Sequence, residues 1–332
     1  MKRIGVHALL LGVAALVASG AAIAALKASA GAKAKVKVAL VLPCPTNDGS
    51  WCQQAYVAAK QLQKEGAIDL QVTSNAPQDT AGASQVIERY ASNGAQLVIA
   101  DSAWQDAAFA AAKKFPKVPI VYAGGGKASG NVSTFEEPIY QPAYLAGILA
   151  AGITKTKVVG GLAAFDIPLC HAQMVAFIKG AQSVSSSIKG VTSYVGDWND
   201  VAKGKNAALA LASQKADVFT VCGGGPASGL ISALKEKNLS GFGYVGNQNN
   251  LAPKQMVGSL VYNLYPIFKA IVADVANGSY KGKDYNLGLQ SFDLVLNPKY
   301  SVAQIPSSSK QKQQQVATAI LAGKFKVPYV IK

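Results

Sequence analysis

The sequence predicts an α/β protein with two doubly wound, parallel-sheet lobes, joined by a hinge and separated by a central cleft. From Val36 onward, short apolar runs rich in β-branched residues alternate with helix-like segments, which is typical of a parallel sheet wound by right-handed crossovers. The alternation runs through two comparable halves with a seam near 137–144. Polar and aromatic residues follow the strands, where ligand groups lie in such sheets.

The order of apolar runs gives the elements. We expect strands over 36–42, 70–73, 97–100, 120–122, 158–162, 191–195, 218–221, 244–246 and 259–262, with more strand-like sequence over 287–296. We expect helices over 50–64, 83–93, 107–114, 142–152, 173–184, 202–213, 227–237, 266–276 and, near the end of the chain, in the stretch 307–325.

These elements suggest a division of the chain into a leader and two lobes. Residues 31–141 form an expected N-terminal lobe, which a late segment at about 261–282 completes. Residues 142–260 form an expected C-terminal lobe, completed by about 283–332. With 332 residues, of which 50% are hydrophobic, the chain is long enough for two cores.

Residues 1–30 resemble a signal peptide. Lys2 and Arg3 precede a charge-free run from Ala8 to Leu26, and Ala28-Ser29-Ala30 fits a small-x-small cleavage site, so the mature chain is expected to begin near Gly31. The alternative is an uncleaved anchor, because the run is long enough to span a bilayer. No cysteine stands near this site, so a lipobox is not expected.

The formal charge is +15, and removal of residues 1–30 leaves +12. A basic exported protein associates weakly with anionic lipid or wall polymers. The lysines are scattered rather than clustered with aromatic residues, which argues against nucleic-acid binding.

Four cysteines, at 44, 52, 170 and 222, predict disulfides in an exported chain. Three pairings are possible, and we favour Cys44–Cys52 with Cys170–Cys222 because of their places beside strands. A metal site is the rival interpretation, but His171 is the only histidine outside the leader and no C-x-x-C spacing occurs.

The loops after the predicted strands contain all three tryptophans of the chain. Tryptophan commonly packs in a core, yet an aromatic face beside amides and carboxylates also suits a flat heterocycle, whose edges Asn, Asp and Gln can bind. The candidate ligand-binding residues are Asn47, Asp48, Trp51, Trp104, Asp166, Trp198, Gly224, Gln248, Asn250 and Asn263.

Several of these residues have a structural alternative. Asp48 and Asp200 stand where they could cap helices, and the glycine-rich loops 124–126 and 223–225 could simply turn tightly or hold a phosphate. "GGGPASG" lacks the Lys-Ser/Thr of a nucleotide-binding loop. No convincing nucleophile and base pair is present, so an enzyme is not expected.

The motifs "LVLPCPTNDGSWCQQAY", "YLAGILAAGITKTKVVGGLAAFDIP", "FIKGAQSV", "ADVFTVCGGGP" and "NNLAP" resemble the basic membrane protein (BMP) family. These are PnrA-like, nucleoside-type substrate-binding proteins of ABC importers, and the resemblance extends from about Lys37 to Asn297. It implies a type I periplasmic-binding-protein fold whose lobes close on a purine nucleoside or base. By position it implies that Trp51 stacks on the base beside Asp48 and Asn47, and that Trp104, Trp198 and Asn263 match cleft residues.

The chain departs from the family at positions that bear on the ribose. Cys52 stands where many members have Asn, Leu169 and Gln141 stand where Glu is frequent, and 247–250 replaces an acidic ribose-binding segment. Carboxylates hold vicinal hydroxyls through charge-assisted hydrogen bonds, so a free base or another flat heterocycle becomes a plausible ligand.

The resemblance therefore implies an exported solute-binding protein, in the periplasm or on the outer face of the cytoplasmic membrane. The expected partners are a purine-like solute and an ABC permease, with no cofactor, no nucleic acid and a monomeric state. The alternatives are a ligand sensor for a membrane partner, or the same fold with an amino acid or sugar as its solute.

Overall fold

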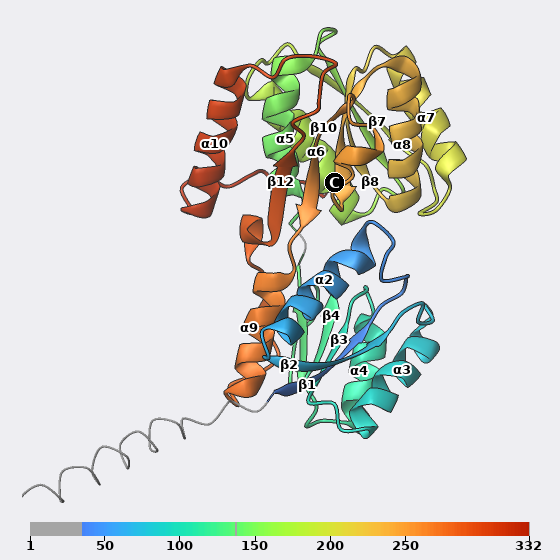
Figure 1. Cartoon of the computed structure of the whole chain (residues 1–332), viewed down its shortest axis with the longest axis vertical. Helices are drawn as coiled ribbons and strands as arrows, with labels where there is room; N and C mark the ends of the chain where they lie inside the picture. The colour runs from blue at the N-terminus through green and yellow to red at the C-terminus, as the bar shows by residue number, and fades with distance from the viewer. Residues whose placement is uncertain (1–34, 137, 332) are drawn as a thin grey trace, which may run out of the picture. The chain divides into compact units, whose positions relative to one another are not determined.

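The computed structural model describes residues 35–136 and 138–331, and it contains two six-stranded sheets (Figure 1). The expected leader, residues 1–30, lies outside the described residues. Val36–Lys332 forms one compact unit. Among the described helices, none combines the length and the apolar character that crossing a bilayer requires.

The first sheet has the strand order β11-β5-β4-β3-β1-β2, and all its pairings are parallel. Its strands are β1 (Val36–Val41), β2 (Ile68–Thr73), β3 (Leu97–Ala100), β4 (Ile120–Ala123), β5 (Val132–Phe135) and β11 (Asp284–Tyr285). Its helices are α2 (Trp51–Lys64), α3 (Thr80–Ser92), α4 (Gln105–Lys114) and α9 (Tyr265–Ala276).

The second sheet has the order β12-β10-β9-β8-β6-β7, parallel except for the antiparallel edge strand β12. Its strands are β6 (Val158–Ala163), β7 (Lys189–Tyr194), β8 (Val218–Cys222), β9 (Ser240–Val245), β10 (Met256–Tyr262) and β12 (Phe292–Leu296). Its helices are α5 (Tyr140–Ile153), α6 (Pro168–Gln182), α7 (Val201–Ser213), α8 (Gly224–Lys237) and α10 (Ser307–Leu321), and short 3₁₀ turns occur at η1 (Asn249–Leu251) and η2 (Gly288–Ser291).

The central strands of both sheets, such as β3, β4, β8 and β9, are wholly buried, as their near-continuous apolar sequence requires, whereas β2 and β7 are partly exposed. One face of the first sheet packs in a separate cluster around Ala39, Val41, Ile87 and Tyr122, beneath α3 and α4. The other face and the second sheet share the larger cluster, which contains Leu40, Phe177 and Phe268. The predicted fold of two α/β sheets is confirmed.

Several strands differ from the sequence prediction: β11 was not expected, β10 begins at Met256 rather than Ser259, and β5 and β9 differ for identifiable reasons. β5 was not expected, because Ser133 and Thr134 make it look polar; both are fully buried, and their hydroxyls donate to the carbonyls of Lys281 and Tyr122. β9 begins at Ser240 rather than at Tyr244, because Gly241 and Gly243 hide its apolar character.

The late elements connect to both sheets. α9 packs on α2 and β1, β11 pairs with β5, and β12 pairs with β10. We propose the lobe boundaries given above, with 31–141 and about 261–282 in the first lobe and 142–260 and about 283–332 in the second. β11 lies just outside the range proposed for the first lobe, although it pairs in that lobe's sheet.

Candidate functional site

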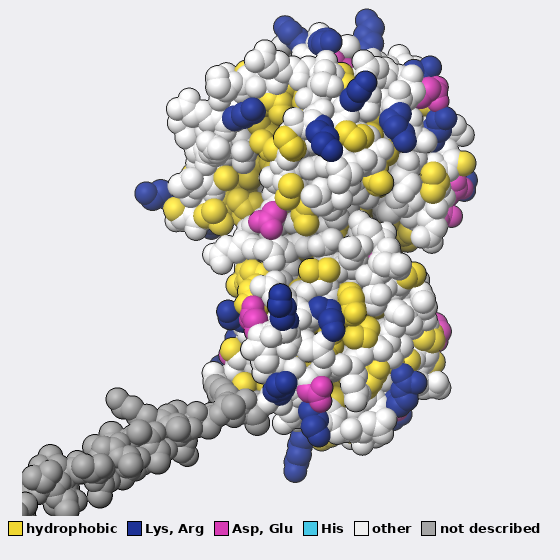
Figure 2. Space-filling view, in the orientation of Figure 1, with side chains coloured by type: hydrophobic (Ala, Val, Ile, Leu, Met, Phe, Trp, Pro, Cys, Tyr) yellow, Lys and Arg dark blue, Asp and Glu magenta, His cyan; other side chains and the backbone are white. Residues whose placement is uncertain are grey.

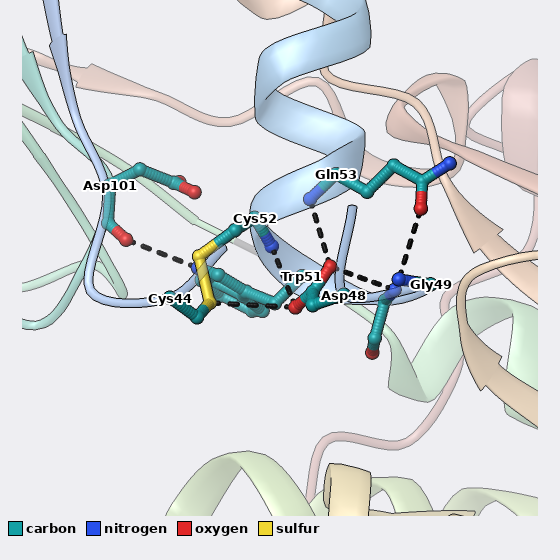
Figure 3. The surroundings of a disulfide bond; sticks show 8 residues. Cys44, Asp48, Gly49, Trp51, Cys52, Gln53 and Asp101 are labelled. Atoms are coloured by element: carbon teal, nitrogen blue, oxygen red, sulfur yellow. Dashed lines mark hydrogen bonds between the residues drawn. A yellow bond between two sulfur atoms is a disulfide. The ribbon is translucent and has the colours of Figure 1, made fainter. Parts of the chain in front are cut away.

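The turn between β1 and α2 is organised by Asp48 (Figure 3). Its Oδ1 accepts hydrogen bonds from the backbone N–H groups of Ser50 and Gln53, both at 3.0 Å, and its Oδ2 accepts from that of Cys52 at 3.2 Å. Three donors that the first helical turn leaves unpaired are thereby satisfied. Ser50 holds the N-cap position of α2, and Asp48 supplies the side-chain hydrogen bonds to the first turn; a role for Asp48 in ligand binding stays a prediction.

A disulfide between Cys44 and Cys52 closes the same turn, and a second joins Cys170 to Cys222. This is the pairing favoured from the sequence. The two sulfurs of the first disulfide and the Asp48 carboxylate lie within 4.8 Å of one another, but a disulfide sulfur is not the thiolate that binds metals. The disulfide therefore fixes the path from β1 into α2.

Trp51 is the first residue of α2 and is half-buried. Its indole Nε1 donates to the backbone oxygen of Asp101 at 3.1 Å, across the ends of β1 and β3. Its ring lies 5.8 Å from that of Tyr262 at the end of β10. Because the indole N–H is already hydrogen-bonded, the face of the Trp51 ring is the part that remains available for contact with a ligand.

Tyr262 in turn stacks on Phe292, with 4.8 Å between ring centroids and 19° between planes. We call Trp51, Tyr244, Tyr262 and Phe292 the aromatic cluster. Its members pack around one gap together with Ile139, Leu169 and Val245, and the gap leaves no room for even a water molecule between the side chains. No charged side chain belongs to this lining, and α2 of the first lobe meets β9, β10 and β12 of the second sheet here.

The end of β9 is strained where it meets the first lobe. Val245 has a φ of 61°, which is a genuine outlier for a β-branched residue. The next residue, Gly246, lies so close to the Gly49 carbonyl that a Cβ atom would overlap it. Strain of this kind persists where surrounding structure over-determines the backbone, and functional sites are frequent examples.

Asp101 lies behind Trp51 and is wholly buried, and neither carboxyl oxygen has a hydrogen-bond partner among the described residues. Burial first, and the Asp48 carboxylate second, hold the pKa of Asp101 well above its usual range. A buried carboxyl is costly when charged, so the protonated form is favoured.

The other two tryptophans do not join Trp51. Trp104 is only 5% exposed, packs in the core on the α3–α4 face of the first sheet, and donates from Nε1 to the Gln78 carbonyl at 3.2 Å. Trp198 follows β7, is 39% exposed, and lies 5.4 Å from the ring of Phe165. The structure therefore gives Trp104 the packing role that was the alternative.

The acidic candidates of the second lobe are engaged locally. Asp166 Oδ1 lies 2.8 Å from Nδ1 of His171, and Tyr194 OH lies 3.3 Å from the same nitrogen. Burial, and then Asp166, raise the pKa of Tyr194 to about 12. Asp200 accepts from Lys203 N–H at 2.8 Å and caps α7, and this backbone bond is the main cause of its lowered pKa.

The amide candidates have mixed surroundings. Gln248 is 8% exposed, and its Oε1 accepts from the Tyr244 N–H at 3.0 Å, so it supports the aromatic cluster from behind. Asn263 accepts from Tyr265 N–H at 3.3 Å. Asn47, Asn250 and Gly224 are exposed and lie outside the lining of the gap.

Sequence reasoning did not select Tyr244, Tyr262 and Phe292. Each lies in a strand, where an aromatic residue looks like ordinary core. The available signal was position, since Tyr244 and Tyr262 stand at the carboxyl ends of neighbouring parallel strands, the edge where ligands bind.

Comparison with known proteins agrees with this architecture. Residues 35–329 match the family described as ABC transporter substrate-binding protein PnrA-like. A purine-binding protein of Brucella abortus (strain 2308) is 25% identical over 300 residues, 90% of this chain and 84% of that protein. The nucleoside-binding protein BmpA of an ABC transporter of Lactococcus lactis is 30% identical over 246 residues, 68% of each chain.

A solved structure of a solute-binding protein of an ABC transporter system from Conexibacter woesei superposes with a TM-score of 0.74, at 20% identity, over 89% of this chain and 99% of that one. This likeness shows the fold. The family match covers most of the chain, including both sheets and the aromatic cluster. The chain therefore belongs to the family of PnrA-like substrate-binding proteins of ABC transporters.

Proposed function

We propose that the protein is an extracytoplasmic subunit of an ABC importer that binds a purine base, or a similar flat and neutral heterocycle, in the aromatic cluster. The observation that carries this proposal is the composition of the gap. Four aromatic rings from both lobes meet there, with aliphatic side chains and no charge in the lining. The rings are packed against one another, so they must separate to admit a solute. Ring faces of this kind bind flat heterocycles by stacking.

The surroundings favour a base over a nucleoside. Ribose hydroxyls are well held by free carboxylates, but Asp48 is occupied by three backbone N–H groups and Asp200 caps α7. Leu169 lies in the lining where the family resemblance would suggest a carboxylate. The names of two relatives, one purine-binding and one nucleoside-binding, support the purine class.

Binding in this account closes the lobes on the solute. Trp51 approaches from the first lobe, and Tyr244, Tyr262 and Phe292 from the second sheet. Closure then presents an altered surface to the permease. The protein works as a monomer without a cofactor, and its role is capture and delivery rather than catalysis.

Thermal unfolding of the chain from residue 31 tests the proposal. Adenine, guanine and hypoxanthine are compared with their nucleosides, and glucose and an amino acid mixture serve as controls. A ligand that binds only the folded state adds about 2.7 kcal/mol at 100 times its Kd, so bases are expected to raise the midpoint more than nucleosides. A rise with glucose or amino acids alone would replace the purine proposal with a different solute.

A further inference from the structure

Six exposed lysines lie at one edge of the second sheet. Four of its five parallel strands have an exposed lysine without an ion pair within a few residues of the amino end, and the antiparallel strand β12 has one after its carboxyl end. Before the fifth parallel strand, β9, Lys237 is exposed but pairs with Glu236 at 3.4 Å. We call them the distal lysines: Lys155, Lys157, Lys189, Lys215, Lys254 and Lys299.

The sheet topology places this edge opposite the aromatic cluster. β6 to β10 are parallel, so their amino ends share one edge and their carboxyl ends, with Tyr244 and Tyr262, share the other. β12 is antiparallel, so its carboxyl end returns to the amino edge. Figure 2 shows Lys and Arg side chains gathered along the upper end of the face in view.

Little opposite charge offsets these lysines. None forms an ion pair within the described part of the chain. Asp217 lies at the same edge, but its carboxylate accepts from Thr154 Oγ1 and Lys155 N–H, both at 2.6 Å, and from Thr156 N–H. It is therefore committed to the turn before β6.

Two distal lysines also stand against the local backbone preference. Lys157 and Lys215 have φ values of 59° and 74°, a left-handed conformation that favours glycine or asparagine. Both turns therefore carry a long cationic side chain in a backbone conformation that glycine or asparagine would adopt with less strain.

We propose that the distal lysines form a docking face for the anionic phospholipid surface of a membrane. Lysine is a flexible point charge that suits diffuse attraction to many headgroups, whereas bidentate recognition of single acidic groups favours arginine. The only arginine in the described chain is Arg89, in α3 of the other lobe. Because the face belongs to one lobe and lies away from the cleft, docking leaves the cleft open to solute.

Vesicle sedimentation tests the docking face. The chain from residue 31 contains the whole compact unit and is mixed with phosphatidylcholine vesicles with or without about 30% phosphatidylglycerol. The variant K155Q/K157Q/K189Q/K215Q is compared with K64Q/K113Q/K117Q/K281Q, which removes equal charge from exposed lysines of the other lobe. Melting midpoints confirm that both variants are folded.

We expect the unmodified chain to bind only the anionic vesicles, more weakly as salt rises. The distal variant should lose at least about tenfold in apparent affinity, since each lysine near an anionic surface contributes to binding, and the control variant should lose much less. Equal losses in both variants, or no binding to anionic vesicles at low salt, would overturn the proposal. Binding to poly-glutamate but not to vesicles would overturn it in favour of an acidic protein.

Discussion

At the scale of single residues, Trp51 and Asp48 explain why an aromatic and a carboxylate stand together after the first strand. Asp48 holds the first turn of α2 in place through three backbone hydrogen bonds. Trp51 is held in place by the hydrogen bond that its indole N–H donates to the backbone oxygen of Asp101. The carboxylate therefore positions the helix start, and the ring is the part that faces the gap.

Replacement of Trp51 by alanine is predicted to weaken solute binding strongly. Stacking of one base on an aromatic side chain is worth about 1–3 kcal/mol, so the affinity should fall by about tenfold to a hundredfold in a calorimetric titration. Trp198→Ala is the comparison, because Trp198 lies outside the lining of the gap. An equal loss in both variants would contradict the assignment.

Asp101 is predicted to make the stability depend on pH. Its folded pKa is raised above an unfolded value near 3.9, so its contribution is fully present below the unfolded pKa and is lost as the pH rises through the folded one. Asp101→Asn removes this loss. The free energy of unfolding of the variant, relative to that of the unmodified chain, should therefore increase as the pH rises from 4 to 8.

Urea unfolding at the two pH values measures this difference. Asp69→Asn, at an exposed position of β2, is the control for removal of one carboxylate from the same sheet. An Asp101→Asn difference that does not change with pH would contradict the prediction, because it would show that folding does not raise the pKa of Asp101.

For single residues, the sequence predicted where the tryptophans lie along the chain better than it predicted what each one contacts. It placed all three tryptophans in loops after strands, but only Trp51 reaches the aromatic cluster. Whether a loop residue turns toward the cleft or folds back on its own sheet depends on distant partners, such as Gln78 for Trp104. Such partners cannot be identified from local pattern.

At the scale of elements, the two disulfides constrain segments of very different length. Cys44 and Cys52 are separated by 8 positions, and Cys170 and Cys222 by 52. The chain-entropy relation gives about 2.5 kcal/mol for the short loop and about 4 kcal/mol for the long one.

Cys170→Ala/Cys222→Ala is therefore predicted to destabilise the protein more than Cys44→Ala/Cys52→Ala, by about 1.5 kcal/mol in chemical unfolding. The shorter disulfide holds the turn that positions Trp51, so its loss should instead have the larger effect on solute affinity. A smaller effect of Cys44→Ala/Cys52→Ala than of Cys170→Ala/Cys222→Ala on solute affinity would show that the β1–α2 turn is held without its disulfide.

The close approach of β9 to the β1–α2 turn gives another test. Gly246→Ala places a methyl group against the Gly49 carbonyl and should keep the lobes apart by a small distance. Solute affinity is expected to fall at least about tenfold, because small misplacements weaken closely fitted sites, while circular dichroism remains that of the native fold. Unchanged affinity would show that this contact is not needed in the bound state.

Element types were readable from the chain because the helices and buried strands have strong periodicity. β5 and the start of β9 were missed because buried hydroxyls and glycines look like loop sequence. In the structure, Ser133 and Thr134 bond to neighbouring backbone, and a Cβ at Gly241 would lie 2.6 Å from a Leu234 methyl carbon. Both are effects of tertiary packing.

At the scale of the molecule, the two halves of the sequence predicted two sheets, and the carboxyl ends of their strands predicted where a ligand would lie. The pattern could not show that Tyr262, stacked on Phe292, contacts Trp51, because that contact joins α2 to a strand more than half the chain away. Charge is also distributed unevenly over the molecule. The lining of the gap is uncharged, and the distal lysines lie at the opposite ends of the strands of the second sheet.

The most direct test of the account is calorimetric titration of the chain from residue 31, and of its Trp51→Ala variant, with adenine and with adenosine. Adenine is expected to bind more tightly than adenosine, and Trp51→Ala is expected to remove most of the affinity for adenine. Tighter binding of adenosine, or binding of adenine that does not depend on Trp51, would contradict the claim that the aromatic cluster is a neutral site for a flat base.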